Sequence, residues 1–192
     1  MRLPHGAVAL AMWSAMACMA APTLPSQAAA GDLLFRRGTE SVSHLVQAVD
    51  RGDFSHVGML VGQPGQWQVL HATPSERPGQ ADAVVLDSLE FFLSPQHTRS
   101  YRLYQVSADR SARQQAVAWA LAQQGRPFHM QDAQQGIYCT TLVWQAWKQA
   151  GVDMNARFTE VELPILGGRY LLPSGLLHSS RLQALTPLLP VY

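Results

Sequence analysis

Cys139 is the residue of this chain best placed to act as a nucleophile, because it stands where a loop gives way to a helical pattern. The loop contains Gly136, and Gly151 ends the pattern that follows. Unpaired N–H groups and the positive end of the helix dipole stabilise a thiolate in the first turn of a helix. The alternative is that Cys139 is a small buried apolar residue without a chemical role. The apolar residues at helical spacing are Leu142, Val143, Ala146 and Ala150.

The first 30 residues have the composition of a secretory signal peptide. Arg2 is the only Lys, Arg, Asp or Glu among them, an apolar run covers residues 7–21, and small residues follow at 28–30. We therefore expect cleavage after Ala28 or Ala30, which leaves residues 31–192 as one exported domain, periplasmic or secreted. A second interpretation is a lipoprotein in which Cys18 is lipidated and attaches the protein peripherally to a membrane.

Removal of residues 1–30 changes two counts that bear on function. It takes Arg2 from the 14 Lys and Arg residues, so the remaining basic residues equal the 13 Asp and Glu residues. A neutral domain without a basic stripe argues against a nucleic-acid partner. It also removes Cys18, and a single unpaired cysteine is unusual in an oxidising compartment. Cys139 is therefore a candidate reactive thiol.

Two histidines lie on neighbouring predicted strands, at residues 54–61 and 67–72, which a short loop joins into an antiparallel hairpin. If the loop is centred between Gln63 and Pro64, His56 lies directly opposite His71, with Cβ atoms about 4.5–5.5 Å apart. The two rings could then form a hydrogen bond in which one fixes the tautomer of the other. The alternative is that the two strands carry histidines by coincidence.

The remaining elements predict a single α+β domain, because helices and antiparallel strands precede the cysteine helix. After Gly151 the chain reads as loop-rich, with a last short helix beginning at Pro173, and Ser88 is a candidate helix cap. Further strands are expected at residues 31–38, 83–87 and 100–107, helices at 41–50, 89–93 and 111–124, and a break at 125–129.

These residues together suggest a nucleophile, a base and an orienting group. Cys139 would attack an acyl carbon, and His56 would hold the thiolate as an ion pair and later protonate the leaving group. His71 would fix the His56 ring. The N–H of Cys139 and a neighbouring donor would bind the oxyanion; Tyr138 and Ser55 belong to this neighbourhood, with packing as the other role open to Tyr138. No phosphate-binding or dinucleotide motif is present in the sequence, and such a hydrolase needs neither cofactor nor metal.

Four short motifs, at residues 31–34, 55–59, 70–72 and 138–143, resemble the permuted papain-like branch of the NlpC-type cysteine hydrolases. This is the YiiX/YaeF group, which is related to lecithin retinol acyltransferase-like enzymes, and the resemblance spans about residues 31–177. It implies a circularly permuted papain-like fold in which the histidine strand precedes the cysteine helix. It also implies a Cys139–His56 dyad with a third polar residue at His71, where members of the group more often carry Glu. An aspartate commonly follows the aromatic residue at 125–129 in the family; here His129 does, and it is assigned no catalytic role.

The resemblance implies hydrolysis of an amide or ester bond in a cell-wall peptide or an acyl or lipid substrate. Export favours a peptidoglycan peptide or a lipid. Two other functions stay open. One is a zinc site made of His56, His71 and Cys139, with or without His129. The other is a ligand-binding member of the same fold that has no turnover.

Overall fold

The computed structural model describes residues 22–130, 137–162 and 167–192, and a seven-stranded sheet lies at its centre. The strand order is β4-β3-β2-β1-β5-β8, β9 also pairs with β5, and all these pairs are antiparallel. A separate hairpin consists of β6 (Thr159–Val161) and β7 (Gly168–Tyr170). The sheet strands are β1 (Leu33–Gly38), β2 (His56–Val61), β3 (Gln68–Thr73), β4 (Ala83–Ser88), β5 (Thr98–Val106), β8 (Leu182–Ala184) and β9 (Leu189–Pro190).

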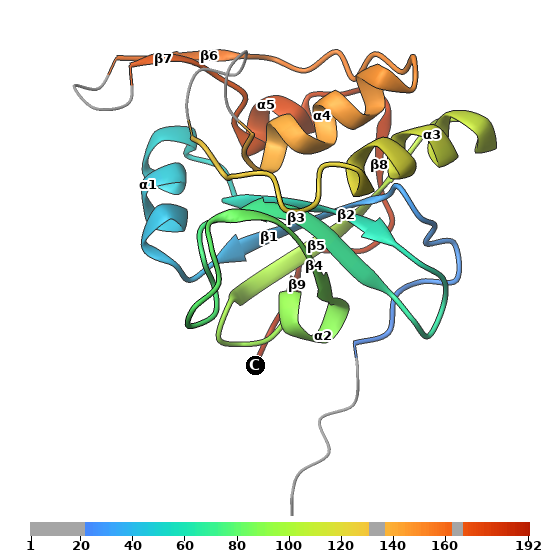
Figure 1. The fold of residues 1–192 in the computed structure, drawn as a ribbon, viewed down its shortest axis with the longest axis horizontal. Helices are drawn as coiled ribbons and strands as arrows, with labels where there is room; N and C mark the ends of the chain where they lie inside the picture. Colours follow the sequence, from blue (N-terminus) through green and yellow to red (C-terminus); the bar gives the residue numbers. More distant parts are fainter. Residues whose placement is uncertain (1–21, 131–136, 163–166) are drawn as a thin grey trace, which may run out of the picture.

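Helices cover both faces of the sheet, as Figure 1 shows. On one face lie α3 (Arg110–Leu121), α4 (Cys139–Gln149) and α5 (Pro173–Leu177), and on the other lies α2 (Leu89–Phe92), while α1 (Ser41–Asp50) flanks one end. The strands therefore carry two cores. Val57 and Met59 of β2 pack in the α4 cluster, whereas Leu60 packs with Phe92 of α2. This arrangement confirms the α+β prediction.

The start of α4 is fixed by the residue that precedes the cysteine. The N–H of Tyr138 donates to Oγ1 of Thr141 over 2.9 Å, and the Thr141 hydroxyl lies 3.1 Å from the Tyr138 carbonyl as a donor to it. Leu142 and Ala146 are fully buried beneath the helix. Gly151, with φ 76°, follows the last turn, which is the usual place for a glycine in the left-handed region. Cys139 is thereby held as the first helical residue, as the sequence predicts.

The predicted strands and helices before Gly151 are confirmed, with ends that differ by no more than a few residues. The Ser88 cap is also confirmed, since its hydroxyl accepts from the N–H of Phe91 over 3.2 Å. After Gly151 the chain contains short strands, β6 to β9, where the sequence indicates only loops and one helix. Strands of two or three residues are too short to show an alternating pattern. Gly136 and Cys18 lie outside the described residues.

The predicted register of the histidine hairpin is wrong by two residues. β2 and β3 pair at Met59–Leu70, Leu60–Val69 and Val61–Gln68, so the loop is centred one residue later than expected. His56 is therefore diagonal to His71 instead of directly opposite it. Because the shift in partner is two residues, both side chains still lie on the same face of the sheet.

Residues just before β1 are packed into the fold. Ala28 is buried in the α2 core, the N–H of Ala29 donates to Asp32 over 2.8 Å, and the carbonyl of Ala30 accepts from Arg113 over 3.1 Å. The expected cleavage positions after Ala28 and Ala30 fall inside this packed segment. Within the described ranges, no helix has the length and hydropathy needed to cross a bilayer.

Gly58 permits the close approach of β2 and β3 beside the histidines. A Cβ atom at this position would lie 2.3 Å from Cγ1 of Val69 and 3.3 Å from Cβ of His71. We predict that Gly58→Ala lowers the free energy of unfolding by about 1–3 kcal/mol, as overpacking does in other cores. Urea denaturation measures this. Val69→Ala removes the clashing atom, so the double variant should lose less than the sum of the single losses; strict additivity would contradict the account.

Candidate active site

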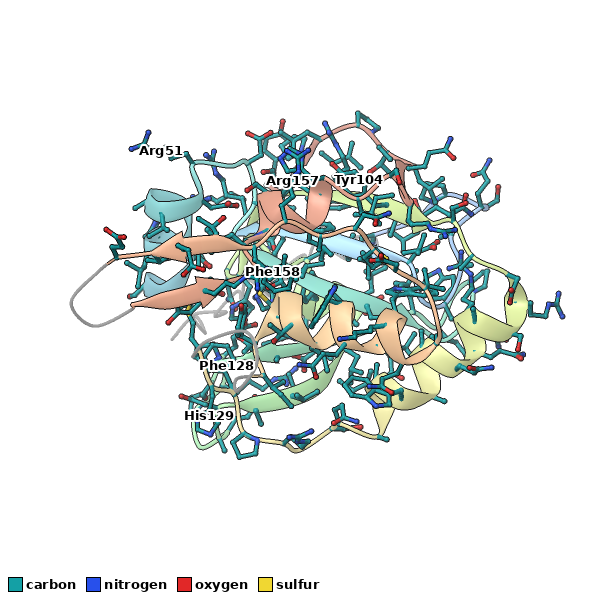
Figure 2. The ribbon with its side chains drawn as sticks, turned by 90° about the horizontal axis from the view of Figure 1, so that it is seen from above. Arg51, Tyr104, Phe128, His129, Arg157 and Phe158 are labelled. Atoms are coloured by element: carbon teal, nitrogen blue, oxygen red, sulfur yellow. The ribbon has the colours of Figure 1, made fainter. Side chains whose placement is uncertain are left out.

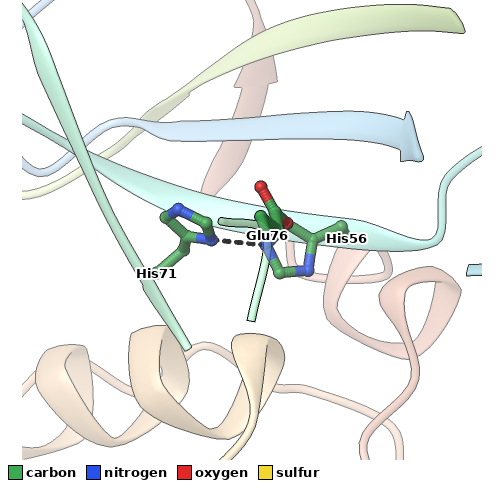
Figure 3. Close-up of side chains that lie close together, drawn as sticks. All are labelled: His56, His71 and Glu76. Atoms are coloured by element: carbon green, nitrogen blue, oxygen red, sulfur yellow. Dashed lines mark hydrogen bonds between the residues drawn. The ribbon is translucent and has the colours of Figure 1, made fainter. Parts of the chain in front are cut away.

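A chain of hydrogen bonds crosses three neighbouring strands on the α2 face of the sheet. Nε2 of His56 on β2 lies 2.8 Å from Nδ1 of His71 on β3, a contact drawn in Figure 3. Nε2 of His71 lies 3.0 Å from Oδ2 of Asp87 on β4, and Oδ1 of Asp87 accepts from Arg77 over 2.5 Å. The predicted contact between the two histidine rings is present, and it continues to a carboxylate.

The charges in this chain decide which nitrogen carries each proton. Burial raises the pKa of Asp87, but hydrogen bonds from His71 and Arg77 outweigh burial and leave this pKa below its usual value. Burial lowers the pKa of His71 despite the opposing bond to Asp87. At neutral pH, His71 is therefore neutral and donates Nε2–H to the Asp87 carboxylate. Its Nδ1 then accepts Nε2–H of His56, which leaves Nδ1 of His56 unprotonated and able to act as a base.

Phe92 of α2 supports both imidazole rings from below. Its ring centroid lies 5.0 Å from that of His71 and 5.8 Å from that of His56. The guanidinium of Arg36 lies 4.3 Å from the same centroid, and its Nη1 donates to the Phe92 carbonyl over 2.8 Å. Arg36 is 1% exposed and is ion-paired with Glu76. Through Phe92, α2 thus positions both the His56 ring and the buried Arg36 guanidinium.

The thiol of Cys139 is buried and meets backbone donors. Burial is the largest influence and raises its pKa to about 11, although hydrogen bonds from the N–H groups of Val57, Thr140 and Cys139 itself lower it, as does the charge of Arg36. Burial also places the pKa of His56 well below 6.5, with smaller contributions from Arg36 and His71. Burial therefore acts against the expected resting thiolate–imidazolium pair and favours a neutral thiol and a neutral imidazole.

The sulfur reaches Val57 because β2 and β3 separate at this point. β2 pairs with β1 as far as Arg36–His56, but its pairing with β3 ends at Met59–Leu70. The N–H of Leu60 donates to the carbonyl of Asp32, just before β1, so by alternation the N–H of Val57 faces β3. Since no partner pairs with it there in the ladder, this N–H is available to the sulfur. Cys139 therefore meets β2 at the separation, one residue from His56.

Tyr138 and Ser55 hold backbone segments next to this point. The Tyr138 hydroxyl accepts from the N–H of Leu171 over 2.8 Å, and the side chain is buried with a 6.2 Å ring contact to Tyr170. The Ser55 hydroxyl accepts from the N–H of Gly38 over 2.9 Å. These contacts give both side chains a role in positioning the backbone around the cysteine and the base.

His129 lies apart from the histidine chain. It is exposed and follows the segment 126–128, which runs along the edge of β4, as Figure 2 shows for Phe128 and His129. On the α4 face, Figure 2 also places Phe158 against the helix, where its ring packs edge-on against Trp144 at 5.3 Å.

Sequence reasoning missed four side chains that surround the histidines: Arg36, Glu76, Asp87 and Phe92. The position of Asp87 could have been predicted from the sequence, because this residue lies near the end of an apolar strand that pairs with the strand of His71. The sequence pattern indicates Arg36 less clearly, as a charged residue within a buried strand. Glu76 lies in the loop after β3, where no periodic pattern could predict its position.

The described residues contain two groups of three that could approach a metal ion. One consists of His56, His71 and Glu76, with ligand atoms within 4.8 Å of one another, and the other consists of Glu40, Glu76 and His97. Neither group of the described residues includes Cys139 or His129, so the zinc set suggested by the sequence is not assembled. In the first group, a hydrogen bond joins the two histidines and an ion pair joins Glu76 to Arg36. The positive charge of Arg36 disfavours a metal cation at this position.

The two buried histidines make stability depend on pH. Their pKa values are lowered in the folded protein, so below about 6.5 the unfolded chain takes up protons that the folded chain does not. We predict that the free energy of unfolding falls from pH 6.5 to pH 5, by up to about 1.4 kcal/mol per pH unit for each histidine. Urea denaturation at each pH measures this.

Two variants provide the comparison for this pH series. The double variant His56→Gln with His71→Gln should flatten the pH dependence, whereas His129→Gln, at an exposed position, should retain the full slope. An unchanged slope in the double variant would show that other groups cause the loss of stability.

Comparisons with known proteins agree with this geometry. A family model described as "Permuted papain-like amidase enzyme, YaeF/YiiX, C92 family" matches residues 27–185. A crystal structure titled as metalloprotein yiiX from Escherichia coli O157:H7 is similar in fold, with a TM-score of 0.69 and 19% identity, covering 84% of this chain and 98% of that one. No curated protein sequence matches. The resemblance seen in the short motifs is confirmed: the chain belongs to the YaeF/YiiX, C92 family of permuted papain-like amidases.

Proposed function

We propose that this protein is an exported cysteine amidase in which Cys139 forms an acyl-enzyme and His56 is the base. The observation that carries the proposal is the hydrogen-bond chain from Asp87 through His71, which leaves Nδ1 of His56 unprotonated. The sulfur of Cys139 contacts the N–H of Val57, the residue that follows this base. A nucleophile, a base and an orienting chain of this kind are the groups that acyl transfer requires.

The proposed reaction begins from a neutral pair. As the sulfur of Cys139 bonds to the acyl carbon of an amide, its proton passes to Nδ1 of His56. The N–H groups of Cys139 and Val57, two of the donors at the sulfur, bind the developing oxyanion. Protonated His56 then gives its proton to the leaving nitrogen, and the amine departs. Water attacks the thioester as His56 takes its proton, the C–S bond breaks to release the acid, and His56 returns the proton to the sulfur of Cys139.

A pocket of about 300 Å³ beside His56 is a candidate substrate site. Charged and polar residues among its lining offer the hydrogen-bond groups that a peptide needs. The signal-like residues 1–30 support an exported location, where a cell-wall peptide is the amide substrate we favour. The lining residues are Arg36, Glu40, Ser41, Val42, Ser43, His56, Thr73, Pro74, Ser75 and Glu76.

Removal of either reacting group should abolish hydrolysis. We predict that Cys139→Ser and His56→Ala each lower kcat by about 10³-fold or more, and that the double variant loses little beyond either one, because the two groups act as a unit. Release of amine from cell-wall peptides measures this, and circular dichroism verifies the fold. Full activity in Cys139→Ser would refute the mechanism.

The orienting residues should matter less than the reacting ones. We predict that His71→Ala and Asp87→Asn each lower kcat by about 10- to 100-fold, since the His56 ring loses its fixed tautomer but keeps its nitrogen. His129→Ala is the matched histidine control and should leave kcat unchanged. A His71→Ala variant as inactive as Cys139→Ser would mean that His71 takes a direct part in proton transfer.

A further inference from the structure

The carboxylate at the end of the histidine chain has a different donor for each of its oxygens. Nε2 of His71 lies 3.0 Å from Oδ2 of Asp87, and Nη1 of Arg77 lies 2.5 Å from Oδ1. Among the residues that the structure describes, these are the two side chains that hydrogen-bond to Asp87. The side chain of Asp87 is 3% exposed, whereas that of Arg77 is 44% exposed. The buried chain of hydrogen bonds therefore meets solvent at Arg77.

A turn in the loop between β3 and β4 fixes the backbone of Arg77. The N–H of Gln80 donates to the carbonyl of Arg77 over 3.1 Å. Pro78 and Gly79 lie between these two residues, and Gly79 has φ 77°. Proline followed by a glycine in the left-handed region is typical of a type II turn. The hydroxyl of Ser75 also donates to the Arg77 carbonyl, over 2.7 Å, so the loop holds this residue from two sides of the chain.

The helix α2 supports the guanidinium of Arg77 through Phe91. The Cζ atom of Arg77 lies 3.6 Å from the centroid of the Phe91 ring, which is a close cation–π contact. The next residue, Phe92, packs against the ring of His71, with centroids 5.0 Å apart. Consecutive residues of one helix thus support Arg77 and His71, the two donors to the Asp87 carboxylate.

The exposure of Arg77 indicates what its loss would change. An ion pair with a half-exposed partner contributes little to the stability of a fold, and water can take the place of the guanidinium at Oδ1 of Asp87. The carboxylate would then keep only the fixed donor of His71. A carboxylate held at one oxygen can rotate, and water admitted beside it competes for the bond to His71. We therefore expect the fold to tolerate this loss better than the hydrogen-bond chain does.

We propose that Arg77 is a positioning residue, which fixes the orientation of the Asp87 carboxylate and excludes water from the hydrogen bond between Asp87 and His71. That bond determines which nitrogen of His71, and through it which nitrogen of His56, carries a proton. The catalytic consequence rests on the proposed function, whereas the positioning itself does not depend on turnover.

Proton NMR of the whole protein tests the positioning without a substrate. The resonance followed is the Nε2–H of His71, assigned by its absence in His71→Gln, and the quantity measured is its rate of exchange with water at pH 7. We expect this exchange to be at least tenfold faster in Arg77→Met than in the unchanged protein. Arg181→Met is the matched control and should leave the rate unchanged, because this exposed arginine precedes β8, at the opposite edge of the sheet from β4.

Hydrolysis of a cell-wall peptide tests the catalytic consequence. We expect Arg77→Met to lower kcat about three- to tenfold with little change in KM, and to cause no further loss in Asp87→Asn, because Arg77 acts through Asp87. Circular dichroism verifies the fold of each variant.

Three results would overturn the proposal. They are equal exchange rates in Arg77→Met and the unchanged protein, an Nε2–H that exchanges too fast to be seen even in the unchanged protein, and the same loss of kcat on removing Arg77 with or without the Asp87 carboxylate. If exchange accelerates in Arg77→Met but the unchanged protein hydrolyses no amide, the positioning stands and the proposed function fails. The two failures are therefore distinguishable.

Discussion

The early end of the pairing between β2 and β3 is the constraint on which the site depends. A continuous ladder would join Val57 to Ala72 and consume the backbone N–H that now meets the sulfur of Cys139. Alternation directs Val57 to the α4 core and His56 to the Phe92 side, so the separation of the strands lies where the residues of the two faces adjoin. The fold thereby brings the start of α4, at Cys139, against β2 at Val57.

Burial sets the resting state of the catalytic groups. It raises the pKa of Cys139 and lowers that of His56, and both shifts favour the neutral thiol and the neutral imidazole. For Asp87, hydrogen bonds from His71 and Arg77 outweigh burial, so its pKa is lowered and the carboxylate form is favoured. One ring, that of His71, thus separates the fixed negative charge from the base, and the charge can hold the tautomers of both histidines and favour an imidazolium during the reaction.

Much of the arrangement could be predicted from the sequence, and the failures have physical causes. The helix beginning at Cys139 and the shared face of His56 and His71 follow from the periodicity of the sequence. Moving the centre of the hairpin loop by one residue changes the cross-strand partner by two residues, so the two histidines stay on the same face. The protonation of Cys139 could not be predicted, because it depends on the burial of the thiol by distant segments. Glu76 and Arg36 form their pair through a loop conformation, and a loop carries no repeating pattern.

The most direct test of the account is the rate of Cys139 alkylation by iodoacetamide as a function of pH, in the unchanged protein and in His56→Gln. The account predicts that at pH 7 the unchanged protein reacts at least tenfold faster than the variant, because Nδ1 of His56 accepts the thiol proton. Its rate should fall only well below pH 6.5, because burial lowers the pKa of His56 and delays its protonation. Superimposable profiles for the two proteins would show that His56 does not act on Cys139 and would contradict the central claim.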